Sequence, residues 1–438
     1  MPKLFKTFQL NTVLAKFKAK SSNTDAHWIL FLFLPFLSAL IAVKAYRSAW
    51  AKNIVWAFIV FYGFTFAIGK ESAVSESESD IVRYVEAMRS YYGKSLDLDA
   101  SIKIFKESGE ADILQTFVMI LVSRFTNSQE VLTGVYGFIF GYFFSRNFWY
   151  VLGMLKGKLR FFSILLLFTF FLINPFWNIN GFRFNTAAHI FFMGILPFIY
   201  EDKKKYLYIS FASVLVHFTF ILPVSILLIY LMLGKRIHLF FILFVLSVFF
   251  KEINIVSFNN VVETNLPDVF VERSKNYRTE EAVEGFRDEG SESRGGIEKN
   301  WYAAFYITSI NWSCIALLVG FYVLCRRKIT NNKRLLTSFC FTLLFFALAN
   351  LLVSIPSGGR FLMIATLLAT TFSALYFQNE IRNKYMENIM IGVTPLILLF
   401  VVVSVRTGFY SISVTTLIGN PIFIFFSDYN ISLNDLIK

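Results

Sequence analysis

The sequence predicts an all-α integral membrane protein that crosses the bilayer many times. Its 438 residues are 56% hydrophobic and 18% aromatic, with 54 phenylalanines and a mean hydropathy of +0.58. Apolar runs of about 17 residues or more recur along the chain, and a helix of that length can cross the hydrocarbon core of a bilayer. A soluble protein of this size would need far more polar surface. We therefore expect residues 1–438 to form a single membrane domain without a separate soluble catalytic domain.

The hydrophobic pattern predicts about 12 membrane-spanning helices, within a range of about 11 to 14. The candidate spans cover residues 27–44, 53–69, 129–145, 161–176, 184–200, 206–217, 218–232, 238–250, 301–325, 335–354, 361–378 and 387–405. Segment 112–125 is too short to cross comfortably, so we expect a helix that lies in the membrane plane or is half-embedded. We expect the same of segment 409–426, which Gly419-Asn-Pro421 interrupts.

Lysines and arginines between the apolar runs predict the orientation of the chain. They gather in six short connections, and the positive-inside rule places all six in the cytoplasm. These connections carry Lys44/Arg47/Lys52, Arg146 with Lys156/Lys158/Arg160, Lys203–Lys205, Lys235/Arg236, Arg326–Lys328 with Lys333/Arg334, and Arg382/Lys384. The chain must then cross the membrane twice between Lys205 and Lys235, where the apolar stretch is short. We therefore expect a tight hairpin of two short helices with its apex near His217, on the outer side.

Because each crossing takes the chain to the other side of the membrane, the same orientation places several polar segments outside. These are residues 70–111, 177–185, 251–300 and 355–360. In the first extracytoplasmic loop, 70–111, a row of apolar residues has the spacing of an amphipathic helix that Ser79 or Asp80 caps. The row consists of Ile81, Tyr84, Val85, Met88 and the pair Tyr91/Tyr92.

Two further segments lie at the margins of the predicted membrane domain. The second extracytoplasmic loop, 251–300, is acidic and rich in glycine and serine over Asp288–Gly296, so we expect it to be partly mobile. Residues 1–26 combine lysines with a helical apolar stripe, which predicts a basic amphipathic helix at the membrane surface. The charge pattern does not settle on which side this N-terminal helix lies.

Composition excludes several classes of protein. The net charge of +13 does not indicate nucleic-acid binding, because most lysines and arginines lie between hydrophobic runs. The three cysteines fall in or at the ends of predicted spans, so we expect no disulfide and no metal–thiolate site. The sequence has no Walker A motif and no zinc-protease or serine-hydrolase motif. Asp97-Leu-Asp99 matches a short metal motif of nucleotide-sugar transferases, but nucleotide sugars are not available outside the cell. We expect neither a metal nor a cofactor.

Some polar and small residues within the spans predict packing rather than chemistry. Gly137 and Gly141 form a small-xxx-small pattern, which is typical of closely packed membrane helices. His189 is interpreted as a packed or hydrogen-bonded helix residue, and Asn311 and Asn350 as side chains that hydrogen-bond between helices.

Four ionisable residues are predicted to lie together on the outer face: Asp80, Arg183, His217 and Arg360. Placing a charged group at the centre of a membrane helix costs about 2.5–3.5 kcal/mol of insertion free energy. Ionisable residues next to apolar runs therefore require a structural or functional explanation. Each also has an ordinary structural explanation. These are a helix cap for Asp80, a reach to lipid headgroups for Arg183, a bond to a loop carbonyl for His217 and a flanking anchor for Arg360. Together the four resemble a site that opens to the outer leaflet.

The four residues suit one kind of chemistry. Two arginines can form charge-assisted, often bidentate bonds to a diphosphate. The glycines before Arg360, in Ser357-Gly-Gly-Arg360, would let backbone N–H groups approach a phosphate closely. The carboxylate of Asp80 or the imidazole of His217 can take a proton from an attacking hydroxyl. This combination fits the displacement of a lipid-linked diphosphate by a sugar hydroxyl.

The order of these features resembles the EpsG-like group of polysaccharide polymerases, which are related in role to Wzy-type O-antigen and capsule polymerases. The matching elements are Ser79-Asp-Ile-Val-Arg-Tyr84, Asn180-Gly-Phe-Arg-Phe-Asn-Thr-Ala-Ala188, Leu215-Val-His-Phe-Thr-Phe-Ile-Leu-Pro223 and the Gly-Gly-Arg360 element. They cover residues 80–225 in order, whereas the second half matches mainly in hydropathy. The family often has Arg-Gln where this chain has Arg183-Phe184, so a role for that glutamine cannot be carried over.

The resemblance implies a membrane glycosyltransferase with a GT-C-like fold in the bacterial inner membrane, whose active site faces the periplasm or the cell exterior. Such an enzyme transfers a growing glycan en bloc from undecaprenyl diphosphate onto another lipid-linked repeat unit. Arg183 and Arg360 would bind the donor diphosphate, and His217 or Asp80 would activate the acceptor hydroxyl. Further candidates for substrate binding are Tyr84, Tyr91 and Tyr92, which we expect to stack on sugars, together with Asn180 and Asn185.

The expected partners are the undecaprenyl-diphosphate-linked donor and acceptor and the membrane lipids. A chain-length regulator is a further candidate partner, and no nucleic acid is expected. Three other functions remain open at this stage. They are a ligase that moves finished glycan to another lipid, a flippase or transporter of lipid-linked oligosaccharides, and a non-catalytic scaffold of the assembly complex.

Overall fold

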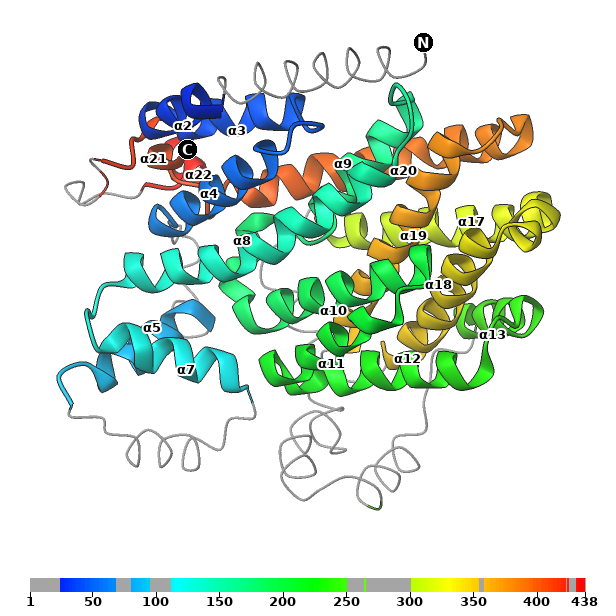
Figure 1. Cartoon of the computed structure of the whole chain (residues 1–438), viewed down its shortest axis with the longest axis horizontal. Coiled ribbons are helices and arrows are strands. Elements are labelled where there is room, and N and C mark those ends of the chain that lie inside the picture. The colour runs from blue at the N-terminus through cyan, green and yellow to red at the C-terminus, as the bar shows by residue number, and fades with distance from the viewer. Residues whose placement is uncertain are drawn as a thin grey trace, which may run out of the picture. The chain divides into compact units, whose positions relative to one another are not determined.

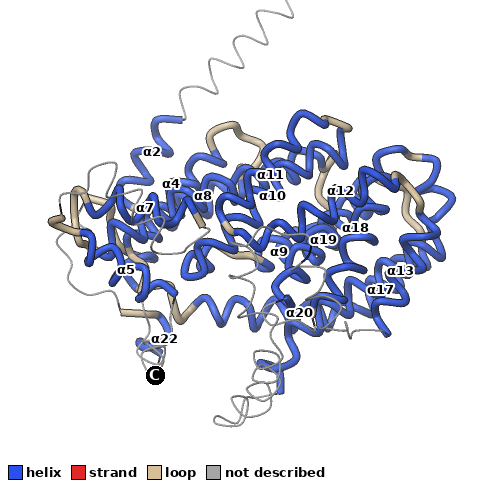
Figure 2. Tube along the Cα trace, turned by 90° about the horizontal axis from the view of Figure 1, so that it is seen from below, coloured by secondary structure: helices blue, strands red, loops and turns tan. Residues whose placement is uncertain are grey.

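The computed structural model describes residues 24–67, 80–94, 112–249, 264, 301–353, 358–422, 424 and 431–437. Every secondary-structure element named within these ranges is a helix (Figure 2). The β-pairing there is an isolated bridge between Ser413 and Ser432. Most of the N-terminal segment 1–26, the loop 251–300 apart from residue 264, and Asp97-Leu-Asp99 lie outside the described residues.

Five helical stretches among the described residues are long and apolar enough to cross a membrane. They are Phe161–Glu201, Phe305–Asn331, Lys333–Leu352, Gly358–Asn379 and Lys384–Gly408. Shorter apolar helices cover Pro35–Lys44, Ala51–Phe64, Ile113–Ser123, Phe218–Leu233 and Ile237–Phe249. The protein is therefore a helical membrane protein, while the count of about 12 spans stays a prediction.

The chain divides into two compact units, and the prediction of a single membrane domain stays a prediction. Unit 1 comprises Met1–Gly153, Phe176–His189 and Thr407–Lys438, and unit 2 comprises Met154–Pro175 and Ile190–Arg406. The described helices of unit 1 are α2 (Thr24–Phe33), α3 (Pro35–Lys44), α4 (Ala51–Phe64), α5 (Asp80–Tyr91), α7 (Ile113–Ser123), α8 (Gln129–Met154), η2 (Phe176–Gly181), α21 (Val414–Ile418) and α22 (Leu433–Ile437).

The described helices of unit 2 are α9 (Phe161–Ile173), η3 (Lys204–Tyr206), α11 (Leu207–Val216), η4 (Phe218–Phe220), α12 (Ile221–Leu233), α13 (Ile237–Phe249), α17 (Trp301–Asn331), α18 (Lys333–Leu352), η5 (Gly358–Arg360) and α19 (Phe361–Asn379). Helices α10 (Phe182–Glu201) and α20 (Lys384–Gly408) contribute residues to both units, and the last residue of α8, Met154, belongs to unit 2.

Glycines bring α4 and α8 into close contact in unit 1. A Cβ atom on Gly137 would lie 2.6 Å from the backbone oxygen of Ile59, and one on Gly63 would lie 2.4 Å from that of Thr133. A Cβ on Gly141 would lie 2.8 Å from the Ile59 side chain. The predicted close packing at Gly137 and Gly141 is confirmed, because only residues without a side chain let the two backbones approach this far.

The C-terminal segment packs on the N-terminal helices of unit 1. Figure 1 shows α21 close to α3, on which it packs. The hydroxyls of Thr65 and Thr416 are 2.8 Å apart, and the Ala67 N–H donates to the Ser411 carbonyl over 3.2 Å. These bonds fix the end of α4 to the turn that follows α20.

Two features of unit 1 differ from the predicted spans. The span 27–44 is broken into α2 and α3 at Leu34, because Pro35 has no N–H to continue the helical ladder and restricts the residue before it. Arg146, expected in a connection, lies inside α8, which is longer than the predicted span 129–145. Its guanidinium donates to the Asn53 side chain over 2.8 Å and lies 4.5 Å from the ring centre of Tyr142, so the helix continues past the charge.

Basic connections gather at one end of unit 2. Lys333, at the start of α18, pairs with Asp202 over 2.7 Å. Its hydrogen bond and charge lower the pKa of that carboxyl below the ordinary value, and the charges of Lys235 and Lys204 lower it further. Lys204 precedes α11 and Lys235 follows α12, so the chain leaves this end and returns to it. The predicted pair of short helices is present, and the chain breaks between them at His217, whose backbone is extended (φ −149°, ψ 117°).

The end of α19 joins the same group of connections. The Gln378 amide donates to the carbonyl of Lys158 over 3.0 Å and accepts from the N–H of Arg160 over 2.9 Å. Lys328 pairs with Glu380 over 3.0 Å, five positions before Lys333. These contacts collect charged groups from four connections at one end of the helices, which is the arrangement that the positive-inside rule favours for loops on one side of a membrane.

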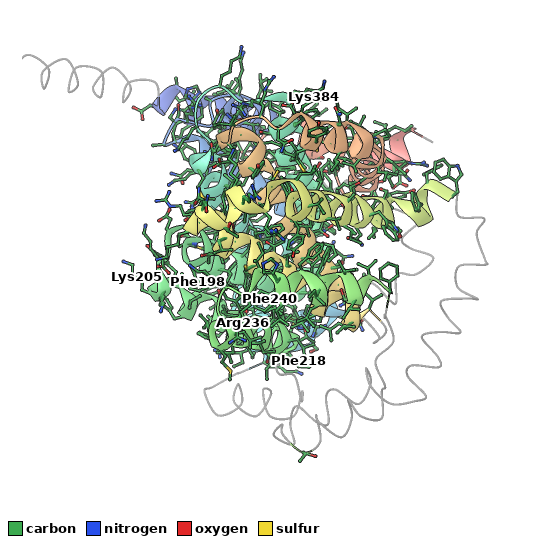
Figure 3. The ribbon with its side chains drawn as sticks, turned by 90° about the vertical axis from the view of Figure 1, so that its right-hand side faces the viewer. Phe198, Lys205, Phe218, Arg236, Phe240 and Lys384 are labelled. Carbon is green, nitrogen blue, oxygen red and sulfur yellow. The ribbon has the colours of Figure 1, made fainter. Side chains whose placement is uncertain are left out.

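Polar side chains link the helices of unit 2 within its apolar interior. The Thr366 hydroxyl donates to Asn311 over 2.9 Å, and the Asn350 amide donates to the Ser247 hydroxyl over 3.1 Å. The predicted interhelical roles of Asn311 and Asn350 are therefore confirmed. Figure 3 shows the buried rings of Phe198 and Phe240 among the helices of this unit, with Lys205 at its edge.

Gly137→Ala is expected to lower the midpoint of thermal unfolding in detergent, because its Cβ is forced against the Ile59 carbonyl. Overpacking of this kind costs about 1–3 kcal/mol. Gly153→Ala is the matched control, since Gly153 lies in the same helix and an added Cβ there meets nothing within 4 Å. That control should leave the midpoint unchanged or raise it, and equal losses in both variants would contradict the packing.

Candidate functional site

Arg183 lies in the first turn of α10, directly after the short helix η2. The preceding residue, Phe182, is fully buried and stacks on Tyr136 with ring centres 4.0 Å apart. This aromatic contact fixes the start of α10 on α8. The direction in which the Arg183 side chain leaves the helix is therefore set by a packed backbone.

The guanidinium of Arg183 is held by groups from two other helical segments. Its Nη1 lies 3.1 Å from Oδ2 of Asp112, the residue before α7, and its Nε donates to the Tyr84 hydroxyl of α5 over 2.9 Å. The guanidinium also lies 5.4 Å from the ring centre of Tyr84. The Asp112 side chain is only 1% exposed and that of Arg183 26%. The charged head of Arg183 is thus fixed by the protein while part of it stays accessible.

Tyr84 is a buried support for Arg183. Burial raises the pKa of its hydroxyl above the ordinary value, and the Arg183 charge opposes this change only in part. The hydroxyl therefore keeps its proton at neutral pH. The ring also meets Tyr136 edge to face, at 6.1 Å between centres. Packing on α8 and on Arg183 buries the ring, and the expected stacking of Tyr84 on a sugar stays a prediction.

Asp80 begins α5 and forms an ion pair with Arg83 one turn later. The predicted amphipathic row is buried as its spacing requires, at Ile81, Tyr84, Val85 and Met88. The side-chain oxygen of Asn180 accepts the Ile81 N–H over 3.2 Å, so η2 is tied to the start of α5. This bond brings Asp80 and Asn180 to the same corner of unit 1 as Arg183.

The remaining substrate-binding candidates of unit 1 have different surroundings. The Asn185 amide donates to the Asn178 carbonyl over 2.9 Å, which closes the turn at the start of α10. Tyr92 is 47% exposed after the end of α5, and Tyr91 is half-buried. Of the three tyrosines, Tyr92 presents the most accessible ring.

In unit 2 the structure brings the turns of His217 and Arg360 together. The His217 ring is 6% exposed and packs against Phe220, with ring centres 6.4 Å apart. Phe220 in turn meets Phe361, the residue after Arg360, also at 6.4 Å. Arg360 is exposed in the single 3₁₀ turn that leads into α19. A Cβ on Gly359 would meet nothing within 4 Å, so the backbone of this turn is open to an approaching group.

The predicted group of four therefore divides between the units. Asp80 and Arg183 belong to unit 1, and His217 and Arg360 belong to unit 2. That all four face one cavity stays a prediction. Within the described ranges, no three His, Cys, Asp or Glu side chains form a group that could hold a metal ion.

Sequence reasoning missed Asp112. An aspartate directly before an apolar helix is an ordinary helix-start residue, yet the Asp112 side chain forms no capping bond to α7. The available signal was an acidic residue at a membrane boundary in a chain whose arginines needed partners. His189, in contrast, is buried as interpreted, and its carbonyl accepts a bond from the Asn147 amide over 2.7 Å.

Comparison with known protein families identifies the group to which the chain belongs. The model of the EpsG family matches residues 54–415, which include every described candidate residue of the site. The chain is therefore a member of the EpsG family, and this membership places it in polysaccharide biosynthesis. No protein of curated function and no solved structure matches the chain.

The Arg183–Asp112 pair should couple strongly in a double-mutant cycle. Removing Arg183 takes the cation away from a buried carboxylate, and removing Asp112 takes away the carboxylate that helps to hold the guanidinium. Alanine at both positions together should therefore cost less than the sum of the single changes, with a coupling of roughly 1–3 kcal/mol in the free energy of unfolding in detergent.

The control cycle uses Asp80 and Arg83, which form an exposed pair in the same region. Exposed pairs couple by about 0.2–1 kcal/mol. A coupling for Arg183 and Asp112 no larger than that of the control would mean that Asp112 does not fix the guanidinium.

Proposed function

We propose that this protein polymerises undecaprenyl-diphosphate-linked oligosaccharide repeat units. The proposal is supported by family membership and, above all, by an arginine at the start of an apolar helix whose guanidinium is fixed by a buried aspartate. A guanidinium held in place before the ligand arrives offers a diphosphate charge-assisted bonds at little cost in side-chain entropy.

The reaction is a glycosyl transfer between two lipid-linked glycans. A hydroxyl oxygen of the acceptor repeat unit forms a bond to the anomeric carbon of the donor glycan. The bond between that carbon and the diphosphate oxygen breaks, and undecaprenyl diphosphate leaves with the electron pair. The hydroxyl proton passes to a base on the protein. Negative charge grows on the leaving diphosphate, so fixed cations beside it lower the barrier.

Arg183 is assigned to the donor diphosphate, with Asp112 and Tyr84 as the residues that position it. Arg360 is assigned to the same anion, because its exposed side chain follows a turn whose backbone is open at Gly359. A guanidinium can neutralise charge without giving up its proton, which suits a leaving group of this kind.

The base is assigned to His217, with Asp80 as the alternative. The Asp80 carboxylate is already engaged in an ion pair with Arg83. His217 lies in a break between two helices, and an imidazole side chain can accept a proton and later release it. The accessible ring of Tyr92 is assigned to a sugar face.

The proposed location is the bacterial inner membrane, with about 12 spans and the site facing the periplasm or the cell exterior. The gathering of basic connections at one end of unit 2 supports this orientation, because that end would face the cytoplasm. The chain breaks at His217 after leaving that end, and α19 runs from Arg360 back to it. The proposed partners are the lipid-linked donor and acceptor, membrane lipids and a chain-length regulator.

Purified protein should lengthen glycan chains when it is given defined undecaprenyl-diphosphate repeat units. Arg183→Gln, Arg360→Gln and His217→Ala should each lower the rate about 10²-fold or more, because each removes a group that acts on charge developing in the reaction. Gel electrophoresis of the labelled products measures chain length and rate together.

Arg124→Gln is the control, since it removes an exposed arginine of unit 1 that has no part in the assigned site. Each variant is also checked for an unchanged elution volume and unfolding midpoint in detergent. Full activity in folded Arg183→Gln would remove the assigned site. Transfer of glycan to a different lipid without lengthening would identify a ligase, and movement of lipid-linked units without any transfer would identify a flippase.

The orientation can be tested with single cysteines, because the three native cysteines are buried. Tyr92→Cys should react with a membrane-impermeant maleimide on intact spheroplasts. Tyr385→Cys, which replaces a 70% exposed residue beside Lys384, should react only after the membrane is permeabilised. The reverse pattern would place the site in the cytoplasm.

A further inference from the structure

Helix α7 carries a row of exposed apolar side chains that the proposed reaction does not explain. Four residues spaced by four positions line up along it: Ile113, Phe117, Leu121 and Phe125, the last just beyond its end. We call them the apolar stripe of α7. They are between 46% and 80% exposed, although they are large and hydrophobic. An exposed row of this kind marks a surface that something apolar covers.

The helix is too short to cross a membrane. Its 11 residues extend about 17 Å, whereas the hydrocarbon core is about 30 Å thick. Helix α5 lies beside it (Figure 1), and α5 exposes the charged residues Arg83, Glu86 and Arg89 on its outer face. The pair of helices thus has a charged surface on α5 and an apolar surface on α7. This arrangement is expected for helices at the boundary between water and lipid.

The stripe begins next to the fixed arginine. Ile113 directly follows Asp112, whose carboxylate holds Arg183 at 3.1 Å. Arg89, near the end of α5, donates to the Asn127 carbonyl, just beyond α7, so the two helices run in the same direction away from Arg183. From Ile113 to Phe125 the stripe is about 18 Å long. A cation and an apolar track of this length therefore lie end to end.

We propose that the apolar stripe of α7 binds the polyprenyl tail of the lipid whose diphosphate Arg183 binds. The inference rests on the proposed function and adds the part of the protein that recognises the lipid. An anionic head joined to a long apolar chain is the ligand chemistry that matches a guanidinium followed by an apolar track. A water-soluble sugar phosphate would use the cation alone, and bulk lipid would cover the stripe without any dependence on Arg183.

The test is photo-crosslinking in nanodiscs. A photoreactive phenylalanine analogue replaces Phe117, and the probe is undecaprenyl diphosphate with a radiolabelled tail. The expected result is strong labelling that unlabelled undecaprenyl diphosphate competes away. The same analogue in place of Leu40 is the control, because Leu40 is a similarly exposed apolar residue of α3 in the same unit. Labelling at Leu40 should be severalfold weaker and should not be competed.

A second variant connects the stripe to the arginine. Arg183→Gln combined with the photoreactive residue at 117 should lose the competable labelling, since the diphosphate no longer holds the lipid in place. Labelling at 117 that is equal to that at Leu40, or that persists in Arg183→Gln, would show that bulk lipid covers the stripe. A crosslink to another copy of the chain would show a protein interface instead, and either result would overturn the proposal.

The same preparation separates this inference from the proposed function. Wild-type protein that lengthens chains but shows no competable labelling would retain the polymerase function and lose the tail site. Competable labelling without any chain lengthening would keep the lipid site and remove the polymerase function.

Discussion

The ion pair between Arg183 and Asp112 is the interaction on which the site in unit 1 depends. A buried carboxylate without a partner is strongly unfavourable, so the Asp112 side chain requires a cation, and the start of α10 supplies it. The pair also determines where α7 begins relative to α10, while Tyr84 brings α5 to the same guanidinium. Three helices far apart in sequence are thereby joined at one charged group, part of which stays open to a ligand.

In unit 2 the charged groups lie at the ends of the helices and not in the apolar interior. Its basic connections gather at one end through ion pairs such as Lys333 with Asp202. The turns of His217 and Arg360 meet through Phe220 and Phe361, and α19 leads from Arg360 back to the basic end. Apolar helices between a basic end and a polar turn match the demands of a bilayer, where charge is tolerated at the boundaries and costly between them.

Local signals predicted much of this from the sequence. The glycine spacing predicted close helix packing at Gly137, without naming α4 as the partner, and the pattern of loop charges predicted the break at His217. The partner of Arg183 was not predictable in this way, because Asp112 is 71 positions away and only tertiary packing brings it near. The contacts of Tyr84 with Arg183 and Tyr136 were missed for the same reason. Pro35 was a local signal for the break between α2 and α3, and a prediction from hydropathy alone does not use it.

The most direct measurement is the affinity of purified protein for undecaprenyl diphosphate and for undecaprenyl phosphate, in the wild type and in Arg183→Gln. If the fixed guanidinium binds the diphosphate, the wild type should prefer the diphosphate lipid and the variant should lose that preference while keeping its fold. A folded Arg183→Gln variant that binds the diphosphate lipid as tightly as the wild type would contradict the central role of this arginine.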